Sequence, residues 1–301
     1  MEAWVIIAVA AAAFQTVRFM LQKQLSMGTL STGGATFSRF FYSVPFITTL
    51  AVGYAVVMGR GWPELGDLFW AYAFAGGLSQ ILATWCVVAL FQQRNFAVGI
   101  TFKKTEVLLT ALVGLIVLGD RVSLAGFVAI FLGLIGVLVL SQKPGVTAGS
   151  YLSRVLNLGT GLGILSGIFF AFSAVGYRGA TLEVLSDDPL SRASIALMLV
   201  TIGQTLGMLV WLKLREPGEI SRVVAARRTA VWMGVTGMAG SLCWFTAFTL
   251  QNAAYVFAVG QIEVVFSLFA SALFFREVIT RKEVTGMALI TLSIICLVLA
   301  A

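Results

Sequence analysis

The sequence predicts an all-α integral membrane protein whose ten transmembrane helices form two inverted five-helix repeats. Its composition is the first reason: of 301 residues, 59% are hydrophobic and 11% are charged, whereas soluble domains carry about 25% charged residues. Long apolar runs are the second reason, and a likeness between the two halves is the third. Only a bilayer can accommodate so much apolar surface on a chain of this length.

Ten apolar runs have about the length that a helix needs to span the hydrocarbon core, roughly 17–25 residues. A β-barrel would show apolar–polar alternation, but runs such as Leu108–Leu118 are almost continuously apolar. Helices therefore satisfy the backbone polar groups within each run. The predicted helices are Ala3–Leu21, Thr36–Met58, Leu68–Phe91, Phe96–Leu118, Leu124–Leu140, Leu158–Tyr177, Leu190–Leu212, Ala230–Leu250, Ala254–Phe275 and Val284–Ala300.

Several kinds of chemistry are excluded by the residues present. The first run follows Glu2 rather than a basic segment, so we expect a retained helix and not a cleaved signal peptide. The chain has no histidine, and its three cysteines lack zinc-type spacing. It has no phosphate-binding glycine loop and no Ser-His-Asp set. We expect no metal, no cofactor and no catalytic residues, and an ATP-driven pump within this chain is excluded.

The two halves align without a gap at an offset of 157 residues. In this register the matching pairs are Cys86 with Cys243, Phe91 with Phe248, Asn95 with Asn252, Glu106 with Glu263, and Asp120 with Glu277. Five matches in one register, several of them polar residues in apolar surroundings, indicate an internal repeat. We predict a first repeat over residues 1–142, a connecting loop over 143–156 and a second repeat over 157–301.

An odd number of helices in each repeat makes the second repeat enter the membrane from the opposite side. Inverted repeats of this kind place the substrate site of secondary transporters near the midplane, between the halves. Lysine and arginine are concentrated in the loops after odd-numbered helices, above all in Lys213–Arg228. The positive-inside rule places these loops in the cytoplasm and both termini outside it. The net charge of +7 is explained by these loops and requires no nucleic acid.

A short pattern follows the fourth helix of each predicted repeat: an acid at the helix end, a small polar residue and then a glycine. It consists of Asp120, Ser123 and Gly126 in the first half, and Glu277, Thr280 and Gly286 in the second. With the five-plus-five repeat, this resembles the drug/metabolite transporter superfamily and its bacterial EamA-type exporters. Many members have a proline early in the fourth and ninth helices, where this chain has Lys-Lys-Thr-Glu and Gln-Ile-Glu. The resemblance implies export or exchange of metabolites, amino acids or drugs across the bacterial cytoplasmic (inner) membrane.

Three charged residues, Lys103, Lys104 and Glu106, lie inside the fourth apolar run. Charges within a membrane face a cavity or pair with each other, and Lys103 and Glu106 share a helix face because they are three residues apart. In one interpretation a lysine attracts an anionic group, while Glu106 balances it or takes up a proton. In the other, an internal Lys–Glu pair only fixes helix packing.

Glu263 is the counterpart of Glu106, and it has Gln261 beside it but no basic neighbour in sequence. Burial disfavours a charged carboxylate, which is how a protonatable coupling site arises. The alternative is a protonated or hydrogen-bonded structural residue. Both interpretations remain open at this point.

The remaining candidates are arginines near helix ends and aromatic residues. Arg39 is the deepest arginine in its run and a candidate cavity contact, whereas the others are expected to snorkel to the interface: Arg18, Arg178 and Arg192. Aromatic side chains near helix ends are often interfacial anchors, so only three are retained as candidate cavity walls: Trp85, Trp244 and Tyr255. Asp120 is expected to cap a helix or to pair with Arg121 or Arg276.

The leading hypothesis is a secondary transporter, not an enzyme, that works by alternating access. Two alternatives remain: an intramembrane enzyme that uses Glu106 and Glu263 as acid–base groups, and a non-transporting membrane scaffold. The expected partners are a small-molecule substrate and membrane lipid, with protons as a candidate coupling ion. The chain would act as a monomer or homodimer. Paired lysines indicate a carboxylate or phosphate substrate, while the aromatic residues suit an amphipathic amine or amino acid equally well.

Overall fold

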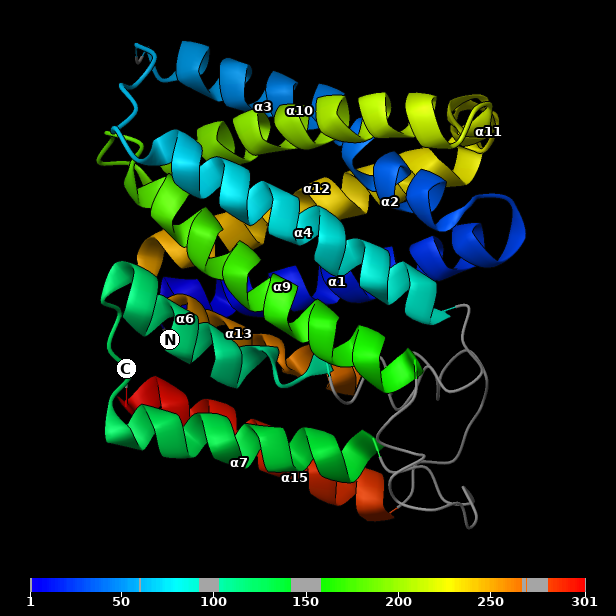
Figure 1. The fold of residues 1–301 in the computed structure, drawn as a ribbon. Coiled ribbons are helices and arrows are strands. Elements are labelled where there is room, and N and C mark those ends of the chain that lie inside the picture. Colours follow the sequence, from blue (N-terminus) through cyan, green and yellow to red (C-terminus); the bar gives the residue numbers. More distant parts are fainter. Residues whose placement is uncertain are drawn as a thin grey trace.

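A computed structural model describes residues 2–59, 61–91, 103–141, 158–266, 269 and 281–300. These residues form long helices joined by short connections (Figure 1). In chain order the helices are α1 (Ala3–Gly28), α2 (Thr32–Phe41), α3 (Val44–Val57), α4 (Phe69–Phe91), α6 (Glu106–Leu118), α7 (Leu124–Ser141), α9 (Leu158–Leu182), α10 (Pro189–Arg215), α11 (Glu219–Ala225), α12 (Arg227–Leu250), α13 (Ala253–Gly260) and α15 (Arg281–Ala300).

The predicted apolar runs are mostly helical where the structure describes them, with short turns inside the second, fourth and ninth runs. Six segments are long and apolar enough to cross a membrane: Ala3–Gly28, Thr32–Val57, Phe69–Phe91, Leu158–Leu182, Pro189–Arg215 and Arg227–Leu250. Four shorter apolar helices coincide with the other predicted runs: Glu106–Leu118, Leu124–Val139, Ala253–Phe266 and Val284–Ala300. Three predicted parts lie outside the described residues: the start of the fourth run, most of the C-terminal part of the ninth run, and the connecting loop. The sequence-based prediction of an all-helical, multi-pass membrane protein is confirmed.

The distribution of polarity is the reverse of that in a soluble protein. Large apolar side chains are exposed on the outside of the bundle, among them Phe74, Ile116 and Leu124. Charged side chains are buried inside it, among them Arg18 and Glu106. This arrangement suits a hydrocarbon solvent, in which an intramembrane charge lies towards the bundle interior.

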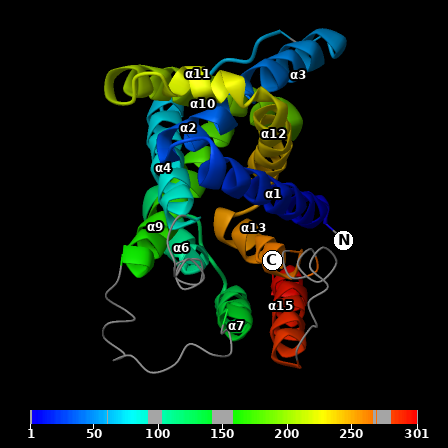
Figure 2. The ribbon, with the colours of Figure 1, turned by 90° about the vertical axis from the view of Figure 1, so that its right-hand side faces the viewer.

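Three long helix pairs form the framework of the bundle: α4 with α9, α1 with α12, and α7 with α15. Helix α10 packs against α3, α2, α4 and α12, and α6 packs against α9 and α13. Figure 2 shows that α7 and α15 lie to one side of the other helices. Helices α6 and α13 connect this outlying pair to the centre, because α6 contacts α7 and α13 contacts both α7 and α15.

Helices α2 and α10 start in the same way at opposite ends of the bundle (Figure 1). The Ser31 hydroxyl accepts a hydrogen bond from the Gly34 amide at 2.9 Å, and the Asp188 carboxylate accepts one from the Ser191 amide at 3.1 Å. Each side chain satisfies an amide of the first helical turn that has no partner within the helix. Positions 188 and 31 differ by 157, the offset of the sequence repeat.

The cap at Asp188 gives a prediction on stability. Burial acts to raise the pKa of this carboxyl, but hydrogen bonds from Tyr54, Ser191 and Leu190 outweigh it, and the pKa is lowered from its ordinary value. Replacing Asp188 with alanine should cost about 0.5–2 kcal/mol of unfolding free energy. Thermal unfolding in detergent, with exposed Asp187→Ala as the matched control, measures this difference.

The pH dependence of this loss has a defined sign. Because the folded-state pKa of Asp188 lies below its unfolded value, the contribution is complete at neutral pH. It disappears as the pH falls below about 4 and through the lowered folded-state pKa. The wild-type protein and the Asp188→Ala variant should therefore converge in stability under acid. A difference that stays constant down to strongly acidic pH would show that the carboxylate is not the stabilising group.

Candidate functional site

Two helices are interrupted at equivalent positions in the middle of the bundle. Residue 103 is helical, residues 104–105 form a turn, and α6 starts at Glu106. In the second half α13 ends at Gly260, a turn occurs at Gln261, and helix resumes over residues 262–266. Lys104 and Gln261 are 157 residues apart, and each is followed two residues later by a glutamate.

These interruptions form without a proline. The Gln261 amide donates to the Ala258 carbonyl at 3.2 Å, and the Val264 amide donates to the Gln261 carbonyl at 3.0 Å. Such i to i−3 bonds tighten the chain locally and end the regular α-helical ladder. In the first half, Gly167 of α9 packs against the break, since a Cβ at that position would lie 3.0 Å from the Lys103 carbonyl oxygen.

Lys103 and Glu106 form a buried ion pair. The Lys103 Nζ lies 3.0 Å from one carboxylate oxygen, to which it donates a hydrogen bond, and 2.9 Å from the other. The exposed fractions of the two side chains are 3% and 6%. The Lys103 ammonium also lies 4.5 Å from the centroid of the Phe170 ring, a cation–π distance. The pairing expected from the three-residue spacing is present.

Glu263 is paired across the two halves of the chain. Lys104 Nζ donates to Glu263 Oε2 at 3.2 Å, and Gln15 Nε2 donates to the same oxygen at 2.8 Å. The Trp244 indole N–H in turn donates to Gln15 Oε1 at 3.1 Å. Sequence reasoning found no basic neighbour for Glu263 because Lys104 is supplied by the other interrupted helix. Contact between the α6 and α13 segments brings the two residues together.

Arg39 is buried and held by neutral groups. Its guanidinium donates to Thr84 Oγ1 at 2.9 Å and to Ser241 Oγ at 3.3 Å. With the Gln80 amide oriented to satisfy its surroundings, the amide oxygen accepts from Arg39 at 2.8 Å and the amide nitrogen donates to Ser173. Arg39 thus lies inside the bundle, as expected for a cavity contact.

Arg18 does not snorkel to the interface as predicted, because its side chain is only 2% exposed. The predicted first helix ended at Leu21, but α1 continues to Gly28, about 15 Å beyond Arg18 at 1.5 Å per residue. Arg18 Nη1 donates to Gln22 Oε1 at 3.1 Å. Nη2 is buried and has no hydrogen-bond partner among the residues that the structure describes.

Arg178 is also not a snorkelling residue. It lies 2.6 Å from Asp120 and donates to the carbonyl oxygens of Phe248 at 2.6 Å and Gln251 at 2.8 Å. This contact ties together the ends of α6, α9 and α12. Asp120 therefore pairs with Arg178 and not with Arg121, while Arg276 lies outside the described residues. Arg192 donates to the carbonyls of Val184 and Leu182, both at 3.0 Å.

Loop contacts draw together the helix ends at both faces of the bundle. At one face, the Ser31 amide donates to Glu219 at 2.6 Å, and the Ser31 hydroxyl donates to Glu216. At the other, the Gly66 amide donates to the Glu183 carbonyl at 2.7 Å, beside the Arg178 contacts. Two interior chambers near the charged residues have volumes of only about 20 and 10 Å³, enough for about one water molecule each. Contacts between helix ends are thus present at both faces of the described bundle.

Comparison with known proteins identifies the family. Residues 157–299 match the sequence profile of the EamA-like transporter family. A solved structure described as "Crystal structure of protein" covers 99% of this chain over 97% of its own length, with a TM-score of 0.70 and 15% identity. The matching residues support the drug/metabolite transporter superfamily that the sequence predicted. The solved structure supports the fold alone. No curated protein sequence matches the chain.

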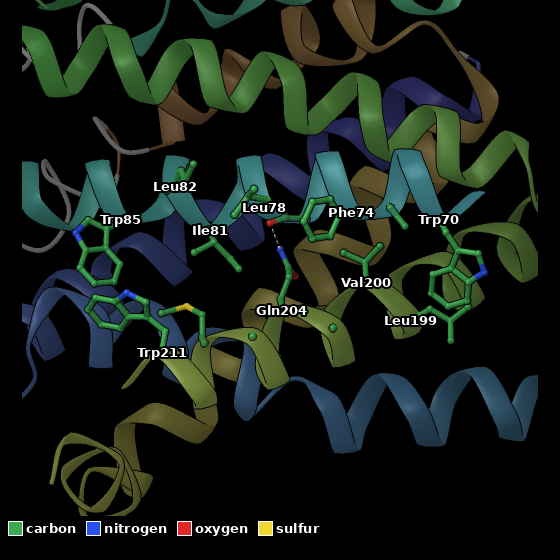
Figure 3. Close-up of a pocket in the computed structure, with 15 residues that line it drawn as sticks. Trp70, Phe74, Leu78, Ile81, Leu82, Trp85, Leu199, Val200, Gln204 and Trp211 are labelled. Carbon is green, nitrogen blue, oxygen red and sulfur yellow. Dashed lines mark hydrogen bonds between the residues drawn. The ribbon is translucent and has the colours of Figure 1, made fainter. Parts of the chain in front are cut away.

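A groove of about 570 Å³ lies between α4 and α10. Figure 3 shows its apolar side chains, with the Trp85 and Trp211 rings edge to face at 4.8 Å between centroids. Trp70 and Phe74 at its rim are exposed on the outer surface, where lipid would lie. Trp85 therefore lines this groove and is not grouped with the ion pairs.

Gln204 separates the groove from the interior. Its amide nitrogen donates to the Gly77 carbonyl at 2.9 Å and to the Tyr177 hydroxyl at 3.0 Å. The Gln204 side chain lines the groove on one side and the chamber containing Arg39 on the other. Sequence reasoning did not single out Gln204, because its position beside Arg39 arises only from helix packing.

The other two aromatic candidates are placed differently. Trp244 lines the chamber that contains Lys103, Glu106 and Glu263, so it joins the charged group. Tyr255 lies at the connection between α6 and α7, where its hydroxyl accepts from the Ser123 amide at 3.0 Å. The sequence-predicted residues therefore lie at four places. The charged set with Trp244 shares one chamber, whereas Arg39, Trp85 and Tyr255 each lie elsewhere.

Proposed function

We propose that this chain is a secondary transporter that moves a small solute by alternating access between two inverted five-helix repeats. The observation that carries the proposal is the equivalent interruption at Lys104 and Gln261, each followed by a buried glutamate. Transporters with inverted repeats build substrate and coupling sites from discontinuous helices near the midplane. The equivalent caps at Ser31 and Asp188 extend the same relation to α2 and α10.

The helix contacts support the proposed division into residues 1–142, 143–156 and 157–301. If α1 to α7 correspond in order to the helices from α9 to α15, the α4–α9 pair has the α1–α12 pair as its counterpart. The α7–α15 contact is then its own counterpart, and α6 packs against α13 across the halves. All four contacts join the two halves, so a rocking motion of one half against the other would act on them. Ten membrane crossings follow from this correspondence.

The two closed faces fit a transporter between its outward-open and inward-open states. Opening one face requires loss of the Ser31 contacts to Glu216 and Glu219, while opening the other requires loss of the Arg178–Asp120 contact. The loop charges support an orientation with the Ser31 face in the cytoplasm and both termini outside it. In a bacterial inner membrane this gives a multi-pass exporter or exchanger.

The buried carboxylates are the proposed coupling groups. Each is held by a lysine at 3.2 Å or less, so a proton or an anionic substrate that enters the site competes for one member of a pair. Gln15 and Trp244 orient Glu263 from α1 and α12. Protonation of either glutamate would free its lysine, which links proton binding to a change in the site.

Transport by purified protein in proteoliposomes tests this function. With a panel of labelled metabolites, amino acids and drugs, we expect uptake of at least one class. Accumulation driven by a pH gradient should be lost in Glu106→Gln and Glu263→Gln, since amides cannot release a proton. Exposed Glu64→Gln serves as the matched control and should retain accumulation.

Two results would contradict these proposals. Gradient-driven accumulation that is unchanged in both variants would refute proton coupling through the carboxylates. Absence of uptake for every compound in the panel, with a folded and correctly inserted protein, would count against transport itself.

A further inference from the structure

Among the described residues, the buried charges in the bundle do not balance. Glu219 is buried at one face, where it pairs with Arg222. The rest of the core holds four cationic side chains and two carboxylates: Arg18, Arg39, Lys103, Lys104, Glu106 and Glu263. The two lysines pair with the two glutamates. Within the described ranges, both arginines have only neutral hydrogen-bond partners. Neither arginine forms an ion pair of its own among the described residues. Glu263, the carboxylate that attracts Arg18, is already paired with Lys104, and an uncompensated charge is costly in the membrane interior.

The two arginines lie next to each other against α12. A Cβ added to Gly237 would be 3.3 Å from Arg18 Cδ and 3.5 Å from Arg39 Cγ, so both side chains cross this glycine. Arg18 Nη2 is buried with an unused hydrogen-bond donor in the described structure. Adjacent guanidiniums are suited to the oxygens of a carboxylate or phosphate, which they bind through several charged hydrogen bonds.

The apolar groove adjoins the small chamber that contains Arg39, one member of this cationic pair. Arg39 and Gln204 line the same small chamber, and Gln204 also lines the groove. In Figure 3 the Gln204 side chain extends from α10 towards α4 among aliphatic and aromatic groups. Rotation of this one side chain away from Gly77 and Tyr177 would connect a lipid-facing apolar space with the guanidiniums.

We propose that the substrate is an amphipathic anion, with its acid group bound by Arg18 and Arg39 and its hydrocarbon chain in the groove between α4 and α10. The acid group follows from the positive charge of the two arginines. The hydrocarbon chain follows from the apolar rim of the groove, which is exposed where lipid would lie. The assignment as substrate rests on the proposed transport function, whereas the binding site does not depend on it. The lysines are occupied by their glutamates, so the arginines are the groups that recognise the anion.

Tryptophan quenching can test the site in the full chain. Trp85 and Trp211 line the groove, so a bromine on a chain that enters it should quench their fluorescence. The probes are undecanoate with a terminal bromine and a trimethylammonium amphiphile with the same brominated chain, added to protein in phosphatidylcholine vesicles. We expect saturable quenching by the carboxylate and only unsaturable partition quenching by the cation. A variant with Trp70→Phe, Trp85→Phe and Trp211→Phe should lose the saturable part, since all three tryptophans line the groove.

Two substitutions separate the acid site from the groove. Arg39→Gln keeps a polar side chain but removes the charge, and it should weaken carboxylate binding by about tenfold. Gly207→Leu fills the groove from a position where no atom lies within 4 Å of an added Cβ, and it should abolish saturable quenching. Gly203→Leu repeats the test from a second open position, and Gly53→Leu on α3, also open, is the matched control.

The outcomes are distinct. Equal quenching by both probes, or saturable quenching that survives Arg39→Gln and both groove-filling variants, would show ordinary lipid contact and overturn the proposal. Selective binding of the carboxylate with the expected losses supports it. If the carboxylate probe binds selectively but is not transported into the same vesicles, the binding site is supported and only the proposed transport function is contradicted.

Discussion

Replacing Lys103 with methionine is expected to destabilise the protein by about 3–5 kcal/mol, the cost typical of removing one partner from a buried ion pair. Methionine matches the length of the lysine stem but leaves the Glu106 carboxylate, at 4% exposure, without its cation. The carboxylate then stays charged and uncompensated, or takes up a proton at a cost in free energy. Unfolding of the purified protein by denaturant in a mild detergent, followed by fluorescence, measures the loss.

The double variant Lys103→Met/Glu106→Gln provides the decisive comparison. Removing both charges also removes the desolvation cost, so most of the lost stability should return. Exposed Lys213→Met is the control for loss of a lysine and should change stability by no more than about 0.5 kcal/mol. If the double variant is as unstable as the single one, the packing of the lysine stem and not the ion pair holds the helix break together.

The helical framework could be predicted because hydrocarbon imposes a strong constraint on the sequence. Every span must be apolar over most of its length, and the ten predicted runs coincide with described helices on that account. Helix ends were less predictable, because polar residues can continue a helix beyond the lipid. The extension of α1 from Leu21 to Gly28 is the instructive case, since it turned Arg18 from an expected interfacial residue into a buried one.

The candidate site was predictable only where its contacts are local or follow the repeat. The three-residue spacing of Lys103 and Glu106 gave their pairing, and the 157-residue offset identified Glu263 as the counterpart of Glu106. Contacts between distant helices carry no such signal. The Lys104–Glu263 pair, the Arg178–Asp120 contact and the position of Gln204 between two cavities depend on which helices cross, and no local pattern records that.

These cross-helix contacts change which residues are proposed to recognise the substrate. In the sequence, two lysines precede Glu106 in the first half and none precedes Glu263 in the second, which suggested that the lysines choose the substrate. In the structure each lysine neutralises a glutamate, one in each half, so the central charges of the interrupted helices form two matched pairs. The unmatched charges belong to α1 and α2, through Arg18 and Arg39. The asymmetry that selects a substrate is therefore expected there, and coupling is expected at the symmetric pairs.

Replacing Gly176 with alanine is expected to force α4 and α9 apart and to destabilise the protein by about 1–3 kcal/mol or more. An added Cβ would lie 2.7 Å from the Gly76 Cα, 2.9 Å from the Gly76 nitrogen and 3.0 Å from the Tyr72 carbonyl oxygen. All three atoms belong to backbone, so no side-chain rotation can relieve the contact. Small residues allow this kind of close backbone approach between membrane helices, where dispersion contacts and not hydrophobic burial hold helices together.

Gly161→Ala on the same helix is the matched control, because nothing lies within 4 Å of a Cβ at that position. Alanine favours a helix over glycine by up to about 1 kcal/mol, so this variant should be neutral or slightly more stable by the same unfolding measurement. Equal stability of the two variants would show that the α4–α9 crossing tolerates separation. If only Gly176→Ala loses stability, the α4–α9 crossing is a fixed contact between the halves. A rocking motion would then turn about this crossing and would not separate the two helices.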